Sequence, residues 1–229
     1  MPEETPAMIK VQTTLPRAPF PANAARAAIR TERLVIRPLG PGDLGALHGL
    51  RTQREVMART ALGRVDADVA ETQAKLDPFL PPRDADTYNP GIYLAATGEL
   101  VGLGGVFGRG SALGWPEVGY MIRREHWGRG YTTEFLRAFV EDWWALPRAD
   151  AEVVVDARSV EGMGEGEGER VPEMLCAVVE DSNTASLRVM EKAGFRRFKS
   201  WKVASRRPGT EGEEVTLVGF VNVRPEGAA

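Results

Sequence analysis

The stretch over residues 117–134 constrains the fold of this chain most strongly, because a strand pattern there runs through a two-glycine turn directly into a helix pattern. The strand pattern covers 117–123, and apolar side chains recur at helical spacing over 132–144. Between them, Gly128 and Gly130 let the backbone turn tightly and bring its N–H groups close to an anion. A helix N-terminus adds unpaired donors and a partial positive charge. The stretch therefore predicts an anion cradle at a strand-to-helix turn.

The residues of this turn fit more than one kind of site. No Gly-Lys-Ser/Thr sequence follows it, so it is not a P-loop, and Thr133 stands where a dinucleotide-binding turn requires a third glycine. Arg129, together with Arg123 and Arg124 before the turn, supplies positive charge for a pyrophosphate. From the residues alone, a pyrophosphate cradle, a purely structural turn and a nucleotide- or phosphometabolite-binding site remain open.

The other local patterns place this turn in a sheet with helices. They predict, in chain order, a strand over 34–37, helices over 44–57 and 68–79, a hairpin of strands over 92–97 and 100–107, a strand over 175–179, a helix over 183–193, and strands over 195–204 and 215–221. Asp43 is placed to cap the first helix, and Gly194 ends the last one. This order predicts a mixed α/β sheet with helices on its faces.

Two segments differ from this regular pattern. The first 30 residues are rich in Pro, Ala and Thr and lack a continuous apolar run, which predicts a flexible arm over 1–30 and no signal peptide. Glycine and glutamate alternate over 161–169, and such a run cannot bury apolar surface. We therefore expect one domain over 31–229, interrupted by a mobile Gly/Glu-rich insertion over 158–170.

Composition excludes several classes of function. The formal net charge of −3 argues against nucleic acid as a partner, and no run of apolar residues is long enough to span a membrane. With one cysteine, Cys176, and two histidines, His48 and His126, the chain cannot build a disulfide framework or a Cys- or His-rich metal site. We expect a cytoplasmic protein without a metal, as a monomer or a homodimer, with Cys176 as a buried thiol.

Three blocks of the sequence resemble the GNAT superfamily of N-acetyltransferases. The residues over 117–122 and 126–134 are similar to its acetyl-CoA signature, and those over 31–39 and 180–195 are similar to the opening strand and closing motif of its ribosomal-protein N-terminal (Rim-type) branch. The blocks occur in the family's order. The resemblance implies a single GNAT-like domain with a mixed, mostly antiparallel central sheet, splayed strands and helices on both faces.

The resemblance also implies acetyl-CoA as cosubstrate and names the residues that would hold it. The pantetheine arm would insert between two splayed strands and meet backbone groups of Met121, Ile122 and Arg123. Asn183 would contact the arm, and Ser186 would lie near the sulfur. The turn residues that would hold the pyrophosphate are Trp127, Gly128, Arg129, Gly130, Tyr131 and Thr132.

The implied reaction is direct attack of a primary amine on the thioester. Glu117 is the candidate general base, an N–H near Met121 or Ile122 the candidate oxyanion donor, and Ser186 the candidate donor to the departing thiolate. Many family members have a tyrosine where Met190 stands, so a non-catalytic acyl-CoA-binding or sensing module is the alternative hypothesis. The acceptor stays open between a protein N-terminus and a small amine.

Overall fold

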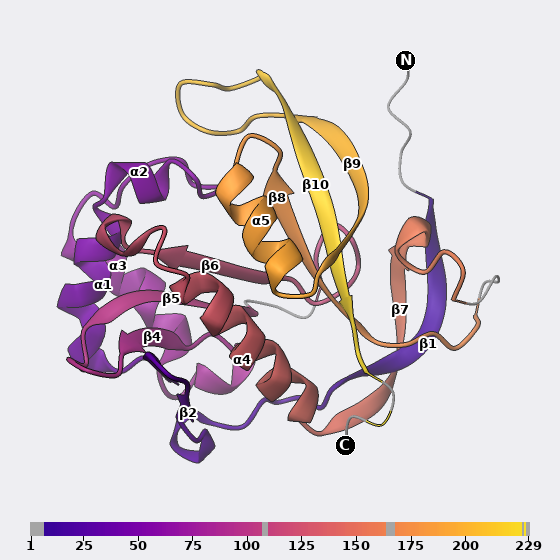
Figure 1. Cartoon of the computed structure of the whole chain (residues 1–229), viewed down its shortest axis with the longest axis horizontal. Helices are drawn as coiled ribbons and strands as arrows, with labels where there is room; N and C mark the ends of the chain where they lie inside the picture. The colour runs from indigo at the N-terminus through magenta and orange to yellow at the C-terminus, as the bar shows by residue number, and fades with distance from the viewer. Residues whose placement is uncertain (1–6, 107–109, 164–167, 226, 228–229) are drawn as a thin grey trace.

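A contact between two antiparallel sheets organises the fold (Figure 1). The computed structural model describes residues 7–106, 110–163, 168–225 and 227. The strands within these residues are β1 (Met8–Pro16), β2 (Ile29–Arg30), β3 (Leu34–Arg37), β4 (Gly91–Leu94), β5 (Leu100–Val106), β6 (Val118–Ile122), β7 (Arg148–Asp156), β8 (Met174–Glu180), β9 (Arg196–Ala204) and β10 (Glu214–Val223). The α-helices are α1 (Leu44–Arg51), α2 (Arg54–Met57), α3 (Val69–Leu76), α4 (Tyr131–Ala145) and α5 (Thr184–Lys192).

The two sheets meet at one point and then separate. One has the strand order β2-β3-β4-β5-β6 and the other the order β8-β10-β9. Glu117, just before β6, forms a parallel bridge with Cys176 of β8, where the Cys176 N–H donates to the Pro116 carbonyl at 2.8 Å. Beyond this bridge the described parts of β6 and β8 share no ladder pairs, so the strands part toward their carboxyl ends. The predicted splayed strands and mixed, mostly antiparallel α/β fold are confirmed.

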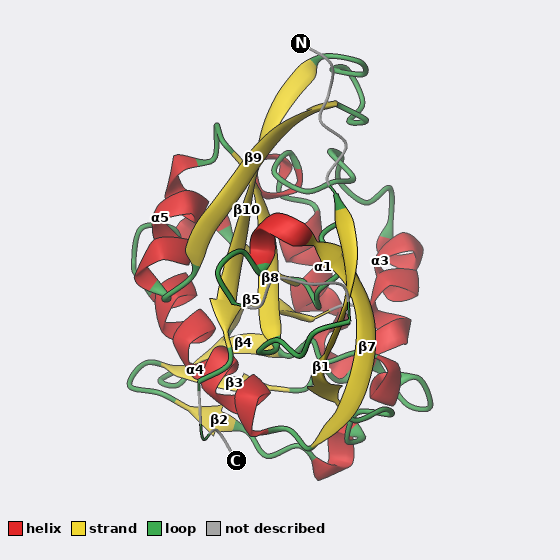
Figure 2. Ribbon diagram, turned by 90° about the vertical axis from the view of Figure 1, so that its right-hand side faces the viewer, coloured by secondary structure: helices red, strands yellow, loops and turns green. Residues whose placement is uncertain are grey.

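Helices cover both faces of the larger sheet, as Figure 2 shows with α4 and α5 on one side and α1 and α3 on the other. Side chains alternate along β6, so Val118 and Ile122 pack into the same core as Phe135 and Phe139 of α4, whereas Met121 packs on the α1 side. Burying each large apolar side chain contributes about 1.5–3 kcal/mol. This core fixes α4, and the glycine turn before it, against the splayed strand.

The predicted helix over 44–57 is divided into α1 and α2. Gln53 adopts an extended conformation between them, and its side-chain carbonyl accepts the Arg124 N–H at 2.8 Å. Asp43 does not cap α1 with its side chain; its Oδ2 accepts the Gly40 N–H of the preceding turn at 2.8 Å. Asp68, predicted as the first residue of the second helix, instead caps α3 by accepting the Glu71 N–H. The described residues contain no helix long and apolar enough to cross a bilayer.

The chain before the first predicted strand differs from the expected flexible arm over 1–30. Strand β1 pairs with β7 in an antiparallel ladder, and Val11 and Leu15 on one side of it are buried. Phe20 packs in the main core, 5.6 Å from the Tyr88 ring and 5.9 Å from the Trp143 ring between centroids. The polar residues of β1 concealed its alternating apolar positions, and its partner lies far along the sequence.

The expected mobile insertion over 158–170 lies partly outside the described residues, namely at 164–167. Its described ends bind the rest of the protein. Val160 is buried, and on the other side the Gly168 N–H donates to the Lys10 carbonyl at 2.8 Å. The predicted buried thiol is confirmed, because Cys176 is fully buried and its burial raises the pKa of the thiol.

Candidate active site

The edge of β6 that faces β8 carries backbone groups without a ladder partner. The Arg123 N–H donates to the Val101 carbonyl at 2.8 Å, so Met121 and Arg123 direct their backbone groups toward β5. Ile122, between them, directs its N–H and carbonyl toward the gap between the sheets. Its carbonyl accepts a hydrogen bond from Trp127 Nε1 at 2.7 Å, so the Ile122 N–H remains as a donor; by the same alternation, the Tyr120 N–H also faces this edge.

The three strand residues that were predicted to contact the cosubstrate therefore differ in where they direct their backbone groups. Ile122 presents backbone groups to the gap, whereas those of Met121 pair with β5 and its side chain lies on the α1 side. The Arg123 guanidinium pairs with Glu99 at 3.3 Å and with Glu125 at 3.2 Å, so its charge is already matched.

The glycine turn has the geometry of an anion cradle. Gly128 and Gly130 have φ of +72° and +81°, which side chains with a Cβ rarely adopt. Within the described chain, the backbone N–H groups from Gly128 to Thr133 donate no hydrogen bonds to protein acceptors. Arg129 is exposed beside them, and Tyr131 and Thr132 form the first turn of α4. These donors meet the requirements of a diphosphate.

The opening block of the sequence braces this turn from outside. Glu134 of α4 accepts hydrogen bonds from the Thr31 hydroxyl at 2.6 Å and from Arg33 Nε at 2.7 Å. Arg33 also donates to the Arg129 carbonyl at 2.9 Å and stacks 4.8 Å above the Tyr131 ring centroid. Burial alone would raise the pKa of Glu134, but these hydrogen bonds and the Arg33 charge lower it overall. The sequence alone does not show that these two blocks are in contact.

The closing motif brings a second helix start to the other side of the gap. Asn183 caps α5, because its Oδ1 accepts the Ser186 N–H at 3.2 Å. Since β6 and β8 run parallel, the turns that follow them lie at the same end of the splay. Ser186 is partly buried there, and Met190 one turn later is a core residue.

Tyr120 is a site residue that the sequence reasoning missed. It shares a face of β6 with Val118 and Ile122, toward α4 and α5, and its hydroxyl lies against that of Ser186. The hydroxyl is buried without a hydrogen bond of normal geometry to any described residue. Burial raises its pKa to about 12, and the Ser186 contact opposes this change. Its even spacing from Val118 was the available signal, but the sequence did not show that α5 covers this face.

Glu117 lies on the opposite side of the splay from Tyr120. It is partly buried at the bridge with Cys176, and it lies four positions before Met121, so both side chains point to the α1 side of the strand. Burial raises the pKa of its carboxyl group, and none of the described lysines and arginines forms an ion pair with it. A desolvated carboxylate without a cation is a stronger base than a solvated one.

A pocket of about 350 Å³ opens on the same side as Met121. Its volume falls within the range of small-molecule sites. It is lined by residues from α1, α3, the segment after α3 and the strands β5 and β6, namely Leu47, Arg51, Ala74, Lys75, Pro78, Phe79, Thr87, Leu103 and Met121.

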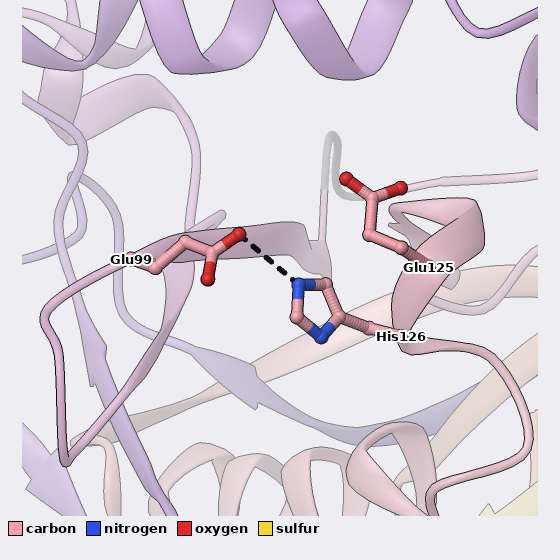
Figure 3. A group of neighbouring side chains, drawn as sticks. All are labelled: Glu99, Glu125 and His126. Atoms are coloured by element: carbon pink, nitrogen blue, oxygen red, sulfur yellow. Dashed lines mark hydrogen bonds and ion pairs between the residues drawn. The ribbon is translucent and has the colours of Figure 1, made fainter.

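Glu99, Glu125 and His126 form a cluster whose ligand-type atoms lie within 4.8 Å of one another (Figure 3). His126 Nε2 lies 3.2 Å from Glu99 Oε1. The Arg123 guanidinium pairs with both carboxylates, so it already supplies the positive charge that a metal ion would bring. The cluster is an ion-pair network that supports the start of the glycine turn.

Several solved structures have a similar fold. A GNAT-family acetyltransferase from Bacillus anthracis is 21% identical over 86% of this chain and 99% of its own, with a TM-score of 0.61. A Vibrio cholerae protein provisionally named a ribosomal-protein-serine acetyltransferase is 18% identical over 86% and 97%, with a TM-score of 0.59. Spermidine N-acetyltransferase from the same organism, solved with CoA and spermine, is 15% identical over 85% and 97%, with a TM-score of 0.60.

The family profile of the acetyltransferase (GNAT) domain matches residues 33–196. This match begins at Arg33, contains the strands β5 and β6 and the glycine turn, and ends after α5. With its splayed strands and this family match, the chain belongs to the GNAT acetyltransferase family.

Proposed function

We propose that this protein is an acetyl-CoA-dependent N-acetyltransferase that transfers the acetyl group to a primary amine by direct attack on the thioester. The observation that carries the proposal is the gap between β6 and β8, which ends at the unpaired N–H groups from Gly128 to Thr133. An amide-rich arm fits an open strand edge, and a diphosphate fits a row of backbone donors. The CoA in the solved spermidine N-acetyltransferase supports the same choice of cosubstrate.

In this proposal, different residues around the gap bind the cosubstrate, stabilise the oxyanion and remove the proton. The turn from Gly128 to Thr132 binds the diphosphate, and Asn183 holds the arm at the start of α5. The Ile122 N–H, which faces the gap, donates to the oxyanion that develops on the thioester carbonyl. Glu117 removes a proton from the amine, directly or through water, from the α1 side.

The thiolate leaves on the α5 side, where Tyr120 and Ser186 bring two hydroxyl groups together. These donors replace the tyrosine that many family members have where this chain has the buried Met190. The hydroxyl pair favours a catalytic enzyme over the alternative of a non-catalytic acyl-CoA-binding module.

Removing both hydroxyls, as Tyr120→Phe with Ser186→Ala, is expected to lower kcat by roughly 10–150-fold, because a hydrogen bond to an ionised group is worth about 1.5–3 kcal/mol. Each single variant should lose less. Steady-state thiol release measures kcat, and the KM for acetyl-CoA should stay within about twofold. Ser182→Ala, an exposed hydroxyl bonded to Glu180, is the control. An unchanged kcat in the double variant would contradict the assignment.

The acceptor of the proposed reaction is a protein N-terminus or a small amine. A place in the Rim-type branch, supported by the Arg33–Glu134 contact and by the relative named for a ribosomal-protein substrate, would favour the protein N-terminus. The pocket of about 350 Å³ beside Met121 instead suits a small amine.

The cradle is tested by titrating the protein with acetyl-CoA in a calorimeter. Gly130→Trp should weaken binding by at least about tenfold, since a ring in the cradle displaces the diphosphate and costs more than about 1.4 kcal/mol. Gly209→Trp is the matched control, because Gly209 has a similar φ of +84° and open space around it. Normal binding to Gly130→Trp, or competition by ATP but not by CoA, would refute the proposal. Binding without thiol release from any amine would instead favour the non-catalytic module.

A further inference from the structure

We infer that the pocket between α1, α3 and the strands β5 and β6 is the acceptor site, and that it selects a primary amine with an apolar body and a carboxylate over a polycation. This inference rests on the proposed acetyltransferase function and names the class of its acceptor. An α-amino acid with an apolar side chain is the simplest member of that class.

The pocket lies beside the strand edge that faces the gap. Met121 lines it and is the neighbour of Ile122, whose N–H faces the gap where the thioester is expected. Glu117 lies on the same face of the strand as Met121. An amine that enters from this side meets the candidate base and the strand edge, while α4 and α5 occupy the opposite face.

Much of the pocket lining is apolar. Leu47, Phe79 and Leu103 are buried, and with Met121 they form an apolar wall. Burying an aliphatic or aromatic side chain against this wall stabilises the complex by about 25 cal/mol per Å² of apolar surface removed from water. A polyamine or an aminosugar cannot use this wall well, because its amines and hydroxyls would lose water there.

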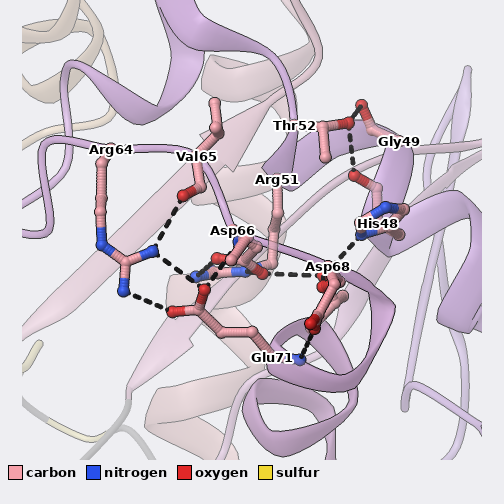
Figure 4. A network of polar contacts seen from close by, with 11 residues as sticks. His48, Gly49, Arg51, Thr52, Arg64, Val65, Asp66, Asp68 and Glu71 are labelled. Atoms are coloured by element: carbon pink, nitrogen blue, oxygen red, sulfur yellow. Dashed lines mark hydrogen bonds and ion pairs between the residues drawn. The ribbon is translucent and has the colours of Figure 1, made fainter.

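The charged side chains that line the pocket are cationic. The described lining residues include two cations, Arg51 and Lys75, and no carboxylate. Arg51 is held by Asp66 through bonds of 2.6 and 2.8 Å, as Figure 4 shows. Lys75 is exposed and forms no ion pair with the described acidic residues; its charge acts on Glu71, one turn earlier, but that carboxylate is bonded to Arg64 at 2.7 Å. Lys75 is therefore the cation that remains to bind a carboxylate, and it repels a polycation.

Matched ligands isolate the carboxylate in a binding experiment. Phenylalanine and leucine are each compared with the amine that lacks only the carboxylate, phenethylamine and isopentylamine, with spermidine as the polycation. Each is titrated into the CoA-saturated protein and assayed for thiol release with acetyl-CoA. At least one amino acid should bind and react at least about tenfold better than its decarboxylated partner and than spermidine, as expected for a carboxylate that meets a cation.

The charge-reversed variant Lys75→Glu links this preference to the pocket. It should raise the Kd and KM for the amino acid by about fivefold or more and leave acetyl-CoA binding unchanged. Lys192→Glu, on α5 on the opposite face of the sheet, is the matched control and should change neither. Equal or better binding of spermidine or of the decarboxylated amines, no binding of either amino acid, or an unaffected Lys75→Glu variant would overturn the inference. Amino-acid binding without thiol release would support the pocket and refute the proposed transfer instead.

Discussion

Replacing Glu117 with glutamine is expected to lower kcat by roughly 10²–10⁴-fold, the usual contribution of a general base. The neutral amide keeps the shape of the side chain but cannot accept a proton from the amine. Burial raises the pKa of Glu117, so the rate of the unmodified enzyme should rise with pH as this carboxyl group ionises. The Glu117→Gln variant should not show this rise. Thiol release at saturating amine and acetyl-CoA, measured across pH, provides both readouts.

The stability of the Glu117→Gln variant separates catalysis from folding. The raised pKa of the folded state means that the carboxyl group contributes stability below its unfolded pKa of about 4.3, which is lost as pH rises through the higher folded value. At neutral pH the charged group therefore opposes folding, so the variant should unfold at the same or a higher urea concentration. Glu161→Gln, an exposed carboxylate, is the control for both measurements. A loss of kcat smaller than about threefold would remove Glu117 from the role of base.

Much of the fold could be predicted where the signal is local. Helix α4 followed from the spacing of Phe135, Leu136 and Phe139, because this pattern depends on residues within one or two turns. The two glycines of the turn were informative for the same reason. Strand β1 was missed because its evidence is its partner β7, whose residues lie more than a hundred positions away in the sequence.

The candidate site shows the same division. Gly128 and Gly130 could be identified as a tight strand-to-helix turn from their neighbours alone, and their left-handed conformation confirms that turn. The contact of Tyr120 with Ser186 could not be predicted, because it depends on which face of β6 is covered by α5. Nor could the different directions of Met121 and Ile122, because they depend on the register of β6 against β5.

The Asp66→Ala substitution is expected to lower the free energy of unfolding by about 3–5 kcal/mol, the usual cost of removing one partner of a buried ion pair. Asp66 is 3% exposed and accepts two hydrogen bonds from Arg51 and one from the Thr72 hydroxyl. Its removal leaves a buried guanidinium without a counter-charge beside the proposed acceptor pocket. Urea unfolding followed by circular dichroism measures the loss, and the acceptor KM should rise in the same variant.

The same pair also predicts how stability depends on pH. Burial alone would raise the pKa of Asp66, but the hydrogen bonds from Arg51 and Thr72 outweigh it and lower the pKa overall. The contribution to stability is therefore present above the unfolded pKa of about 3.9 and is lost as pH falls through the lower folded value. Asp66→Ala should remove this part of the acid-unfolding transition.

The large cost of removing Asp66 comes from the burial of its ion pair with Arg51. An exposed ion pair in the same protein tests this explanation. Arg170 and Asp150 are joined at 2.6 Å, the same distance as Arg51 and Asp66, but their side chains are 62% and 77% exposed. Asp150→Ala should cost less than about 1 kcal/mol, because exposed ions keep most of their hydration. Replacing both buried partners, as Arg51→Met with Asp66→Leu, should recover much of the stability, since no charge is then left unpaired. Equal costs for Asp66→Ala and Asp150→Ala would contradict the role assigned to burial.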